Sequence, residues 1–189
     1  MGKTSEITID LSYLSLEGNV LDIGYQGKGA IYRALTERSV PDFLLETAAA
    51  LDTKLEADDF NWVYGHPNSL PFEDKSFDVM TSFFAFAYID RNRSRMKLIR
   101  EIARTLKNEG KILIWDLNIK DLTISIKKNI NVKLSEDRYV DINMDFLRWP
   151  GNFGADTMLP VVERYFVIKD KYEFDDYFYI EAYKKDDFN

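Results

Sequence analysis

The sequence predicts an α/β fold in which a mostly parallel sheet is doubly wound, with helices on both faces. Short apolar runs alternate with amphipathic stretches along the chain, and a glycine-rich turn follows the first apolar run at Gly24. The 189 residues contain no repeat, linker or low-complexity segment. Such alternation is typical of parallel sheets, because each parallel strand needs a crossover segment before the next one. We therefore expect a single domain over residues 1–189.

The apolar runs and amphipathic stretches predict the elements in order. Strands are expected at residues 20–23, at 43–45 with an end at Glu46, at 60–64, 77–82 and 111–115, and as a terminal pair at 167–174 and 177–184. Helices are expected at 30–38, after Glu46 to about residue 57, around 96–106, and at 156–166, where Pro160 is tolerated if it sits in the first turn. Residues 122–154 are the least regular part, with alternating pieces near 131–134 and 139–144.

The composition excludes several classes of protein. A net charge of −7 argues against binding to nucleic acid or to an anionic membrane, since both need clustered Lys and Arg. The chain has no cysteine and one histidine, His66, so a disulfide framework, a thiol nucleophile and a multi-histidine metal site are excluded. The N-terminus lacks the apolar core of a signal peptide, and no apolar run reaches the length of a membrane span. We expect a soluble cytoplasmic protein.

Polar residues and glycines gather where the expected strands end. Asp22 and Gly24 close the first strand, and a strand–glycine turn–helix unit lets a ligand approach bare backbone N–H groups. Glu46 closes the second strand, where a carboxylate can accept two hydrogen bonds from a ribose diol. The turn after the third strand carries His66 and offers a polar group to an adenine edge, and Ser82 ends the fourth strand. This constellation favours a nucleoside-type cofactor.

Five motifs in this order resemble the class I S-adenosylmethionine-dependent methyltransferases, and among them the small type 11 group. The motifs are Val20-Leu21-Asp22-Ile23-Gly24, Glu46, Leu70-Pro71-Phe72, Ser76-Phe77-Asp78-Val79 and Glu109-Gly110-Lys111-Ile112-Leu113-Ile114. The resemblance implies a Rossmann-like sheet of seven strands, mostly parallel with the last antiparallel. It also implies S-adenosylmethionine as cofactor, with contacts from Asp22, Gly24, Tyr25, Gly27, Gly29, Glu46, His66, Asn68 and Ser82.

The chain departs from that family in three places. One extra residue lies between Gly24 and Gly27, so the glycine loop must bulge beside the cofactor. His66 stands where the family usually has an aspartate facing the adenine amino group. Little chain precedes the first strand, where the family usually has helices that close over the cofactor. These departures favour an alternative, a degenerate methyltransferase fold that acts as a non-catalytic binding or partner module.

The expected function is methyl transfer from S-adenosylmethionine to a small molecule or a protein. Such transfer depends mostly on positioning, so no catalytic residue and no metal is assigned. A nucleotide-binding Rossmann-like protein without methyl transfer remains a second alternative. The acceptor site is expected within residues 117–154, which hold several aromatics beside polar residues. A homodimer could cover the open cleft.

Overall fold

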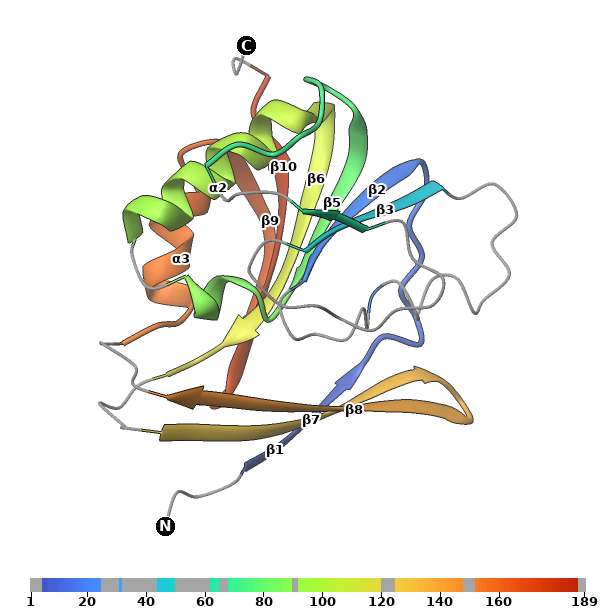
Figure 1. Cartoon of the computed structure of the whole chain (residues 1–189), viewed down its shortest axis with the longest axis vertical. Helices are drawn as coiled ribbons and strands as arrows, with labels where there is room; N and C mark the ends of the chain where they lie inside the picture. The colour runs from blue at the N-terminus through green and yellow to red at the C-terminus, as the bar shows by residue number, and fades with distance from the viewer. Residues whose placement is uncertain are drawn as a thin grey trace.

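The computed structural model describes residues 5–24, 31, 44–49, 62–64, 68–89, 92–119, 125–147 and 152–186. They form two sheets, whose arrangement Figure 1 shows. The larger sheet has seven strands in the order β4-β3-β2-β5-β6-β10-β9. Its strands are β2 (Asn19–Gly24), β3 (Leu44–Ala49), β4 (Trp62–Tyr64), β5 (Phe77–Phe83), β6 (Leu106–Leu117), β9 (Phe166–Glu173) and β10 (Tyr177–Lys184).

The centre of the larger sheet is parallel, and its last strand is antiparallel. β2 pairs in parallel with β3 and β5, and β5 pairs in parallel with β6. β10 runs antiparallel to both β6 and β9. Nearly every side chain of β5 is buried, as expected for a parallel strand that is covered on both faces. The Rossmann-like α/β fold predicted from the sequence is therefore confirmed.

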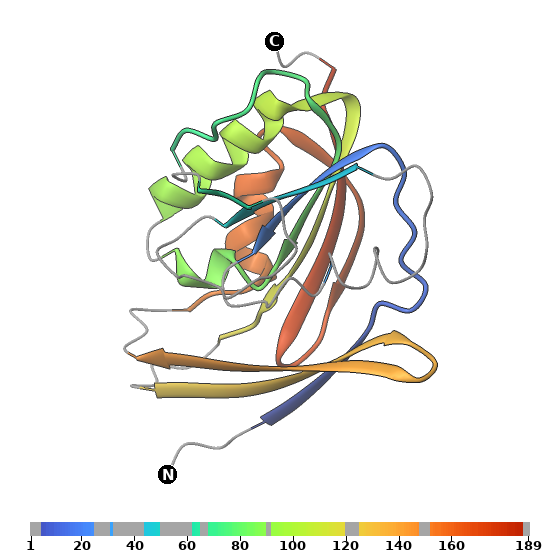
Figure 2. The ribbon, with the colours of Figure 1, turned by 45° about the vertical axis from the view of Figure 1, so that its right-hand side comes forward.

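The two long helices of the described chain cover one face of the larger sheet (Figures 1 and 2). Helix α2 (Asn92–Thr105) buries Leu98, Ile99 and Ile102, whose spacing matches one face of a helix. Helix α3 (Ala155–Val162) packs beside it. Pro160 lies in the second turn of α3, so the condition set for it at the sequence level is not met, and the helix ends at Val162 rather than at residue 166.

A second, smaller sheet was not predicted. It consists of β1 (Ser5–Asp10), β7 (Ser125–Ser135) and β8 (Arg138–Leu147), in the order β1-β7-β8. β1 pairs in parallel with β7, and β7 and β8 form an antiparallel hairpin. In both views this sheet lies beyond the end of the larger sheet at which β6 ends (Figures 1 and 2). The layout is thus mixed, with two sheets, and the prediction of a single seven-stranded sheet is wrong.

Two further boundaries differ from the prediction. β3 continues through Ala49, so Glu46 lies inside the strand rather than at its end, and no helix begins there. β6 begins at Leu106, directly after α2, and includes the predicted stop at residues 108–110. The stop appears instead as an irregularity, since Glu109 has a φ of 61° and the register with β5 shifts between Phe77 and Val79.

The described residues leave two predicted helices untested. Apart from the helical residue Ile31, the helix expected at 30–38 lies outside the described residues, as does the stretch 50–57. Among the described helices, none is long and apolar enough to cross a membrane.

Candidate functional site

Asp22 provides a buried carboxyl group in the central strand of the larger sheet. Its side chain is 1% exposed, and the Thr81 hydroxyl donates a hydrogen bond of 2.7 Å to Oδ1. Burial raises the pKa of Asp22 to about 7, and the bond from Thr81 opposes this only in part. A buried carboxyl group with this pKa changes its charge near neutral pH, so a cation placed beside it would favour the ionised form.

The C-terminal ends of the parallel strands are in register with one another, two residues beyond Asp22. Gly24 ends β2 and is paired with Ala49 of β3 on one side and with Phe83 of β5 on the other. Phe83 is in turn paired with Trp115 of β6. Ligands of open α/β sheets bind outside these carboxyl ends, where the strand order reverses. The order β4-β3-β2-β5-β6 has such a reversal between β2 and β5.

Ser82 is buried, and its hydroxyl has no hydrogen-bond partner among the residues that the structure describes. Successive side chains of a strand point to opposite faces, so Ser82 lies on the face opposite the Thr81–Asp22 hydrogen bond. The structure therefore places Ser82 in the strand next to Asp22 but not on the same side of the sheet.

Asp116 directly follows the strand expected at residues 111–115, and the sequence analysis did not assign it to a site. Its Oδ2 accepts hydrogen bonds from the backbone N–H groups of Phe86 (2.7 Å) and Ala87 (3.2 Å), and its Oδ1 accepts one from Leu117 (2.8 Å). Phe86 begins the short helix η1 (Phe86–Tyr88), which follows β5. Burial raises the pKa of Asp116 to about 7, while these donors and Arg95 lower it in part. Asp116 thus fixes the backbone that leaves β5 at the candidate site.

A buried arginine supports the same segment from α2. Arg95 is 4% exposed; its Nε donates to the Phe86 carbonyl (3.3 Å), and its Nη1 donates to the Asn92 side chain (2.8 Å). Its guanidinium lies 4.4 Å from the centre of the Phe153 ring. A cation stacked on a desolvated ring is a stable arrangement. Phe153, expected near the acceptor, is instead a core residue that also contacts Phe178.

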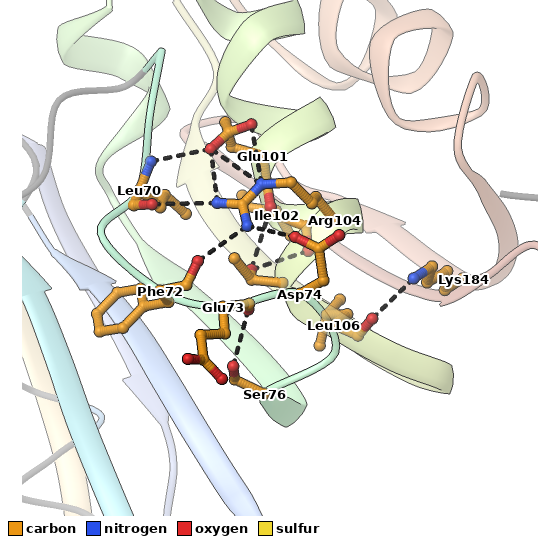
Figure 3. A network of polar contacts seen from close by, with 11 residues as sticks. Leu70, Phe72, Glu73, Asp74, Ser76, Glu101, Ile102, Arg104, Leu106 and Lys184 are labelled. Carbon is orange, nitrogen blue, oxygen red and sulfur yellow. Dashed lines mark hydrogen bonds and ion pairs between the residues drawn. The ribbon is translucent and has the colours of Figure 1, made fainter. Parts of the chain in front are cut away.

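The turn after β4 is held to α2 by a dense set of charged contacts (Figure 3). Arg104 donates to the carbonyls of Leu70 (3.0 Å) and Phe72 (2.8 Å) and pairs with Asp74 (2.7 Å) and Glu101 (2.9 Å). Glu101 accepts a hydrogen bond from the Leu70 N–H (3.0 Å), and this contact and Arg104 lower its pKa despite partial burial. The Leu-Pro-Phe turn is therefore fixed in position at the helix.

The nine predicted contacts are only partly visible. Asp22, Gly24 and Ser82 belong to the paired strands β2 and β5, with Ser82 on the face opposite Asp22, and Asn68 is exposed in the turn that leads into Leu70. Glu46 lies in mid-strand, beside Leu21 of β2. Tyr25, Gly27, Gly29 and His66 lie outside the described residues. Within the described part of the chain, no group of acidic or histidine side chains could hold a metal ion.

The segment expected to bind the acceptor is not irregular. Most of its described part is the β7–β8 hairpin, and Tyr139, on that hairpin, is 54% exposed. Phe153 lies in the core beside α2, so these two aromatics do not form one site. Trp149 lies outside the described residues.

Comparisons with known proteins agree with this geometry. The family described as "Methyltransferase domain" matches residues 21–114, which include most of β2, all of β5 and most of β6. An uncharacterized methyltransferase, YcgJ, from Bacillus subtilis is 33% identical over 73 residues, which are 39% of this chain and 28% of the relative. A demethylmenaquinone methyltransferase from Thermotoga maritima is 34% identical over 104 residues, 52% of this chain and 43% of the relative. The chain thus spans less than half the length of these relatives.

A solved structure of an S-adenosylmethionine-dependent methyltransferase from Methanosarcina mazei has the same fold. Its TM-score is 0.59 at 15% identity, with 91% of this chain and 94% of that chain covered. The fold and the sheet-edge site define a Rossmann-like protein with a nucleoside-type cofactor site. The family match goes further: the chain is a member of the class I S-adenosylmethionine-dependent methyltransferase family, and this supports S-adenosylmethionine as its cofactor.

Proposed function

We propose that this protein transfers the methyl group of S-adenosylmethionine to a small-molecule or protein acceptor. The observation that carries the proposal is the carboxyl group of Asp22. It is 1% exposed, it accepts a hydrogen bond from Thr81, and it lies two residues before Gly24, where β2 ends. Burying such a group costs stability unless something compensates. A cationic cofactor at the adjoining edge supplies a reason for its presence.

The residues at the edge fit the chemistry of this cofactor. S-adenosylmethionine supplies an electrophilic methyl group on a sulfonium, and it also carries an ammonium group. Ionised Asp22 would stabilise this positive charge, and Gly24, which has no side chain, would allow the cofactor to approach the backbone closely. Asn68, in the turn that Arg104 holds, would face the adenosine end. The protein's contribution to catalysis would then be binding and orientation of the two reactants.

Calorimetric titration with S-adenosylmethionine and with its demethylated product tests the cofactor step. We expect binding by the natural chain and by Asp137→Asn, a control that removes an exposed carboxylate in the β7–β8 turn. Asp22→Asn should weaken binding about tenfold or more, because a charge-assisted contact is lost. No heat and no thermal shift at millimolar ligand would contradict the proposal.

The second step tests catalysis itself. Release of the demethylated product, measured with pooled amine, thiol and hydroxyl acceptors, would support the enzyme. Binding of the cofactor without turnover on any acceptor class would favour the non-catalytic alternative, which no observation on the described residues supports at present. Glu46→Ala should weaken cofactor binding about tenfold if Glu46 reaches the ribose. Unchanged affinity in that variant would remove Glu46 from the site.

A further inference from the structure

One cavity, which we call the aromatic pocket, has a lining that does not include Asp22. It has a volume of about 510 Å³ and is bounded by β1 on one side and by β9 and β10 on the other. Six aromatic side chains line it, namely Tyr13, Trp115, Tyr172, Phe174, Tyr177 and Tyr179. A volume of this size suits a small organic ligand.

The strand pattern brings these rings to one face of the sheet. Trp115 of β6 is paired with Tyr179 of β10, which is paired with Tyr172 of β9. Their ring centres are 4.9 Å apart for Trp115 and Tyr179 and 6.0 Å apart for Tyr179 and Tyr172. Phe174 and Tyr177 stack at 4.4 Å where the β9–β10 turn closes the pocket. The cross-strand ring contacts give the pocket a rigid floor.

Several of these rings are unusually exposed. Tyr13 is 71% exposed, Tyr172 57% and Phe174 48%. Single exposed aromatics are common on proteins, but here they surround one cavity. The exposed parts of these rings are therefore available to a ligand.

Three acidic side chains also line the pocket, beside Thr8 and Ile9. Asp10, Asp170 and Glu181 line the pocket, and no lysine or arginine is among the described residues that do so. Lys133 approaches Asp10 from outside (3.4 Å), and Lys169 pairs with Glu181 (3.2 Å). Asp170 has no ion pair within the described part of the chain.

Burial and the acidic side chains of the pocket raise the pKa values of two of its tyrosines, Tyr13 and Tyr179. Burial raises the pKa of Tyr13, and the charge of Asp10 raises it further. Burial raises the pKa of Tyr179 well above its ordinary value, and Glu181 and Asp170 add to this effect. Each carboxylate makes a second negative charge in the pocket less favourable, so an anionic ligand is disfavoured there.

We propose that the aromatic pocket binds a small organic cation with an alkylated ammonium group. Aromatic faces attract such a cation through their quadrupoles, and they bind it without needing to replace tightly held water. Asp170 supplies the unpaired carboxylate that a neutral ligand would not require. The inference goes beyond methyl transfer and holds whether or not the Asp22 site is catalytic.

Choline and its neutral isostere 3,3-dimethylbutan-1-ol test the proposal on the whole chain without cofactor. The two molecules have the same shape, and only choline is charged. Titration followed by nuclear magnetic resonance, at constant ionic strength, should show saturable binding of choline in the millimolar range and at least about tenfold weaker binding of the isostere. Tyr172→Ala should weaken choline binding about fivefold, and Asp170→Asn about threefold or more.

Tyr139→Ala is the matched control, because this ring is also exposed but lies on β8, outside the pocket. It should leave choline binding unchanged. Equal affinity for choline and the isostere would overturn the proposal, since the pocket would then be merely apolar. Failure of choline to saturate up to about 50 mM would also overturn it, as would an equal loss in Tyr139→Ala and Tyr172→Ala. None of these outcomes depends on binding of S-adenosylmethionine.

Discussion

Replacing Asp22 with asparagine should make the protein more stable above neutral pH and impair its use of the cofactor. The carboxyl group is fully buried, and its pKa rises from 3.8 to about 7. Since one pH unit corresponds to about 1.4 kcal/mol, ionised Asp22 costs the folded state up to about 4 kcal/mol. Asparagine has nearly the same shape and never ionises, and its carbonyl can still accept the hydrogen bond from Thr81.

The sign of the pH dependence follows from the raised pKa. Below pH 3.8 Asp22 is protonated in both states and contributes nothing to the pH dependence. Between that value and pH 7 the unfolded chain loses the proton first, so the stability of the natural protein falls as pH rises. Relative to the natural chain, Asp22→Asn should therefore gain about 2–3 kcal/mol between pH 5 and pH 8 and then level off.

Urea unfolding followed by tryptophan fluorescence at pH 5, 6, 7 and 8 measures this difference. Asp78→Asn is an internal control of opposite sign, because Lys107 and the Asn19 N–H lower the pKa of Asp78. That variant should lose stability by a similar amount at all four pH values, because a carboxyl group with a lowered pKa is ionised there in both the folded and the unfolded state; the loss should shrink only as the pH falls below 3.8. The reasoning is refuted if Asp22→Asn is less stable than the natural protein at pH 8 and still binds S-adenosylmethionine normally. Asp22 would then be a structural residue.

Four further measurements follow from the same structure. Binding of S-adenosylmethionine near pH 7 should release up to about half a proton, because a cation favours the ionised form of Asp22. Calorimetry in buffers of different ionisation enthalpy measures the number of protons released. Zero release would exclude a charge contact between the cofactor and Asp22. Asp116→Ala should lower the free energy of unfolding by about 3 kcal/mol or more, since three buried N–H groups lose their acceptor; a urea midpoint close to that of the natural chain would contradict it. Gly18→Ala should cost at least about 1 kcal/mol in urea unfolding, because Gly18 has a φ of 80° and a Cβ would lie 2.5 Å from Asp78 Oδ2; equal stability would mean that the Asp78 side chain moves freely. Arg104→Ala should lower the melting temperature by about 4 °C or more, and it should weaken cofactor binding because Arg104 holds the turn at Leu70 and Phe72. A lower melting temperature with unchanged cofactor affinity would show that this turn is not part of the cofactor site.

Much of the larger sheet could be predicted because its strands carry strong local patterns. The apolar run of β5 and the alternation of buried and partly exposed residues in β10 each predict a strand without reference to the rest of the chain. The irregular appearance of residues 122–154 misled the prediction because β7 carries many polar residues. Its inward positions Ile130, Val132 and Leu134 are buried, while the residues between them are not. A half-solvated hairpin of this kind needs its partner β1 before its pattern is clear.

The candidate site was predictable to a smaller extent. Asp22 and Gly24 stand out because an acid and a glycine end an apolar run. Asp116 also follows such a run, but its role depends on the backbone N–H groups of Phe86 and Ala87, which lie in η1 after a different strand, β5. The aromatic pocket joins Tyr13 to Tyr172 and Tyr179, residues from opposite ends of the chain. Pattern analysis detects what lies within one element, whereas these sites depend on tertiary contacts.

The parallel pairing of β1 with β7 affects how the chain can fold during synthesis. β1 leaves the ribosome well before its partner β7, which is made only after β6 is complete. Until then its apolar residues Ile7 and Ile9 have no place in a sheet, and a long loop must close before they are buried. The residues that alternate with them are Glu6, Thr8 and Asp10, so one side of β1 stays polar until β7 is made. A nascent chain stalled before β7 would therefore expose β1 to proteases and to other chains, and exposure would end only when the hairpin emerges.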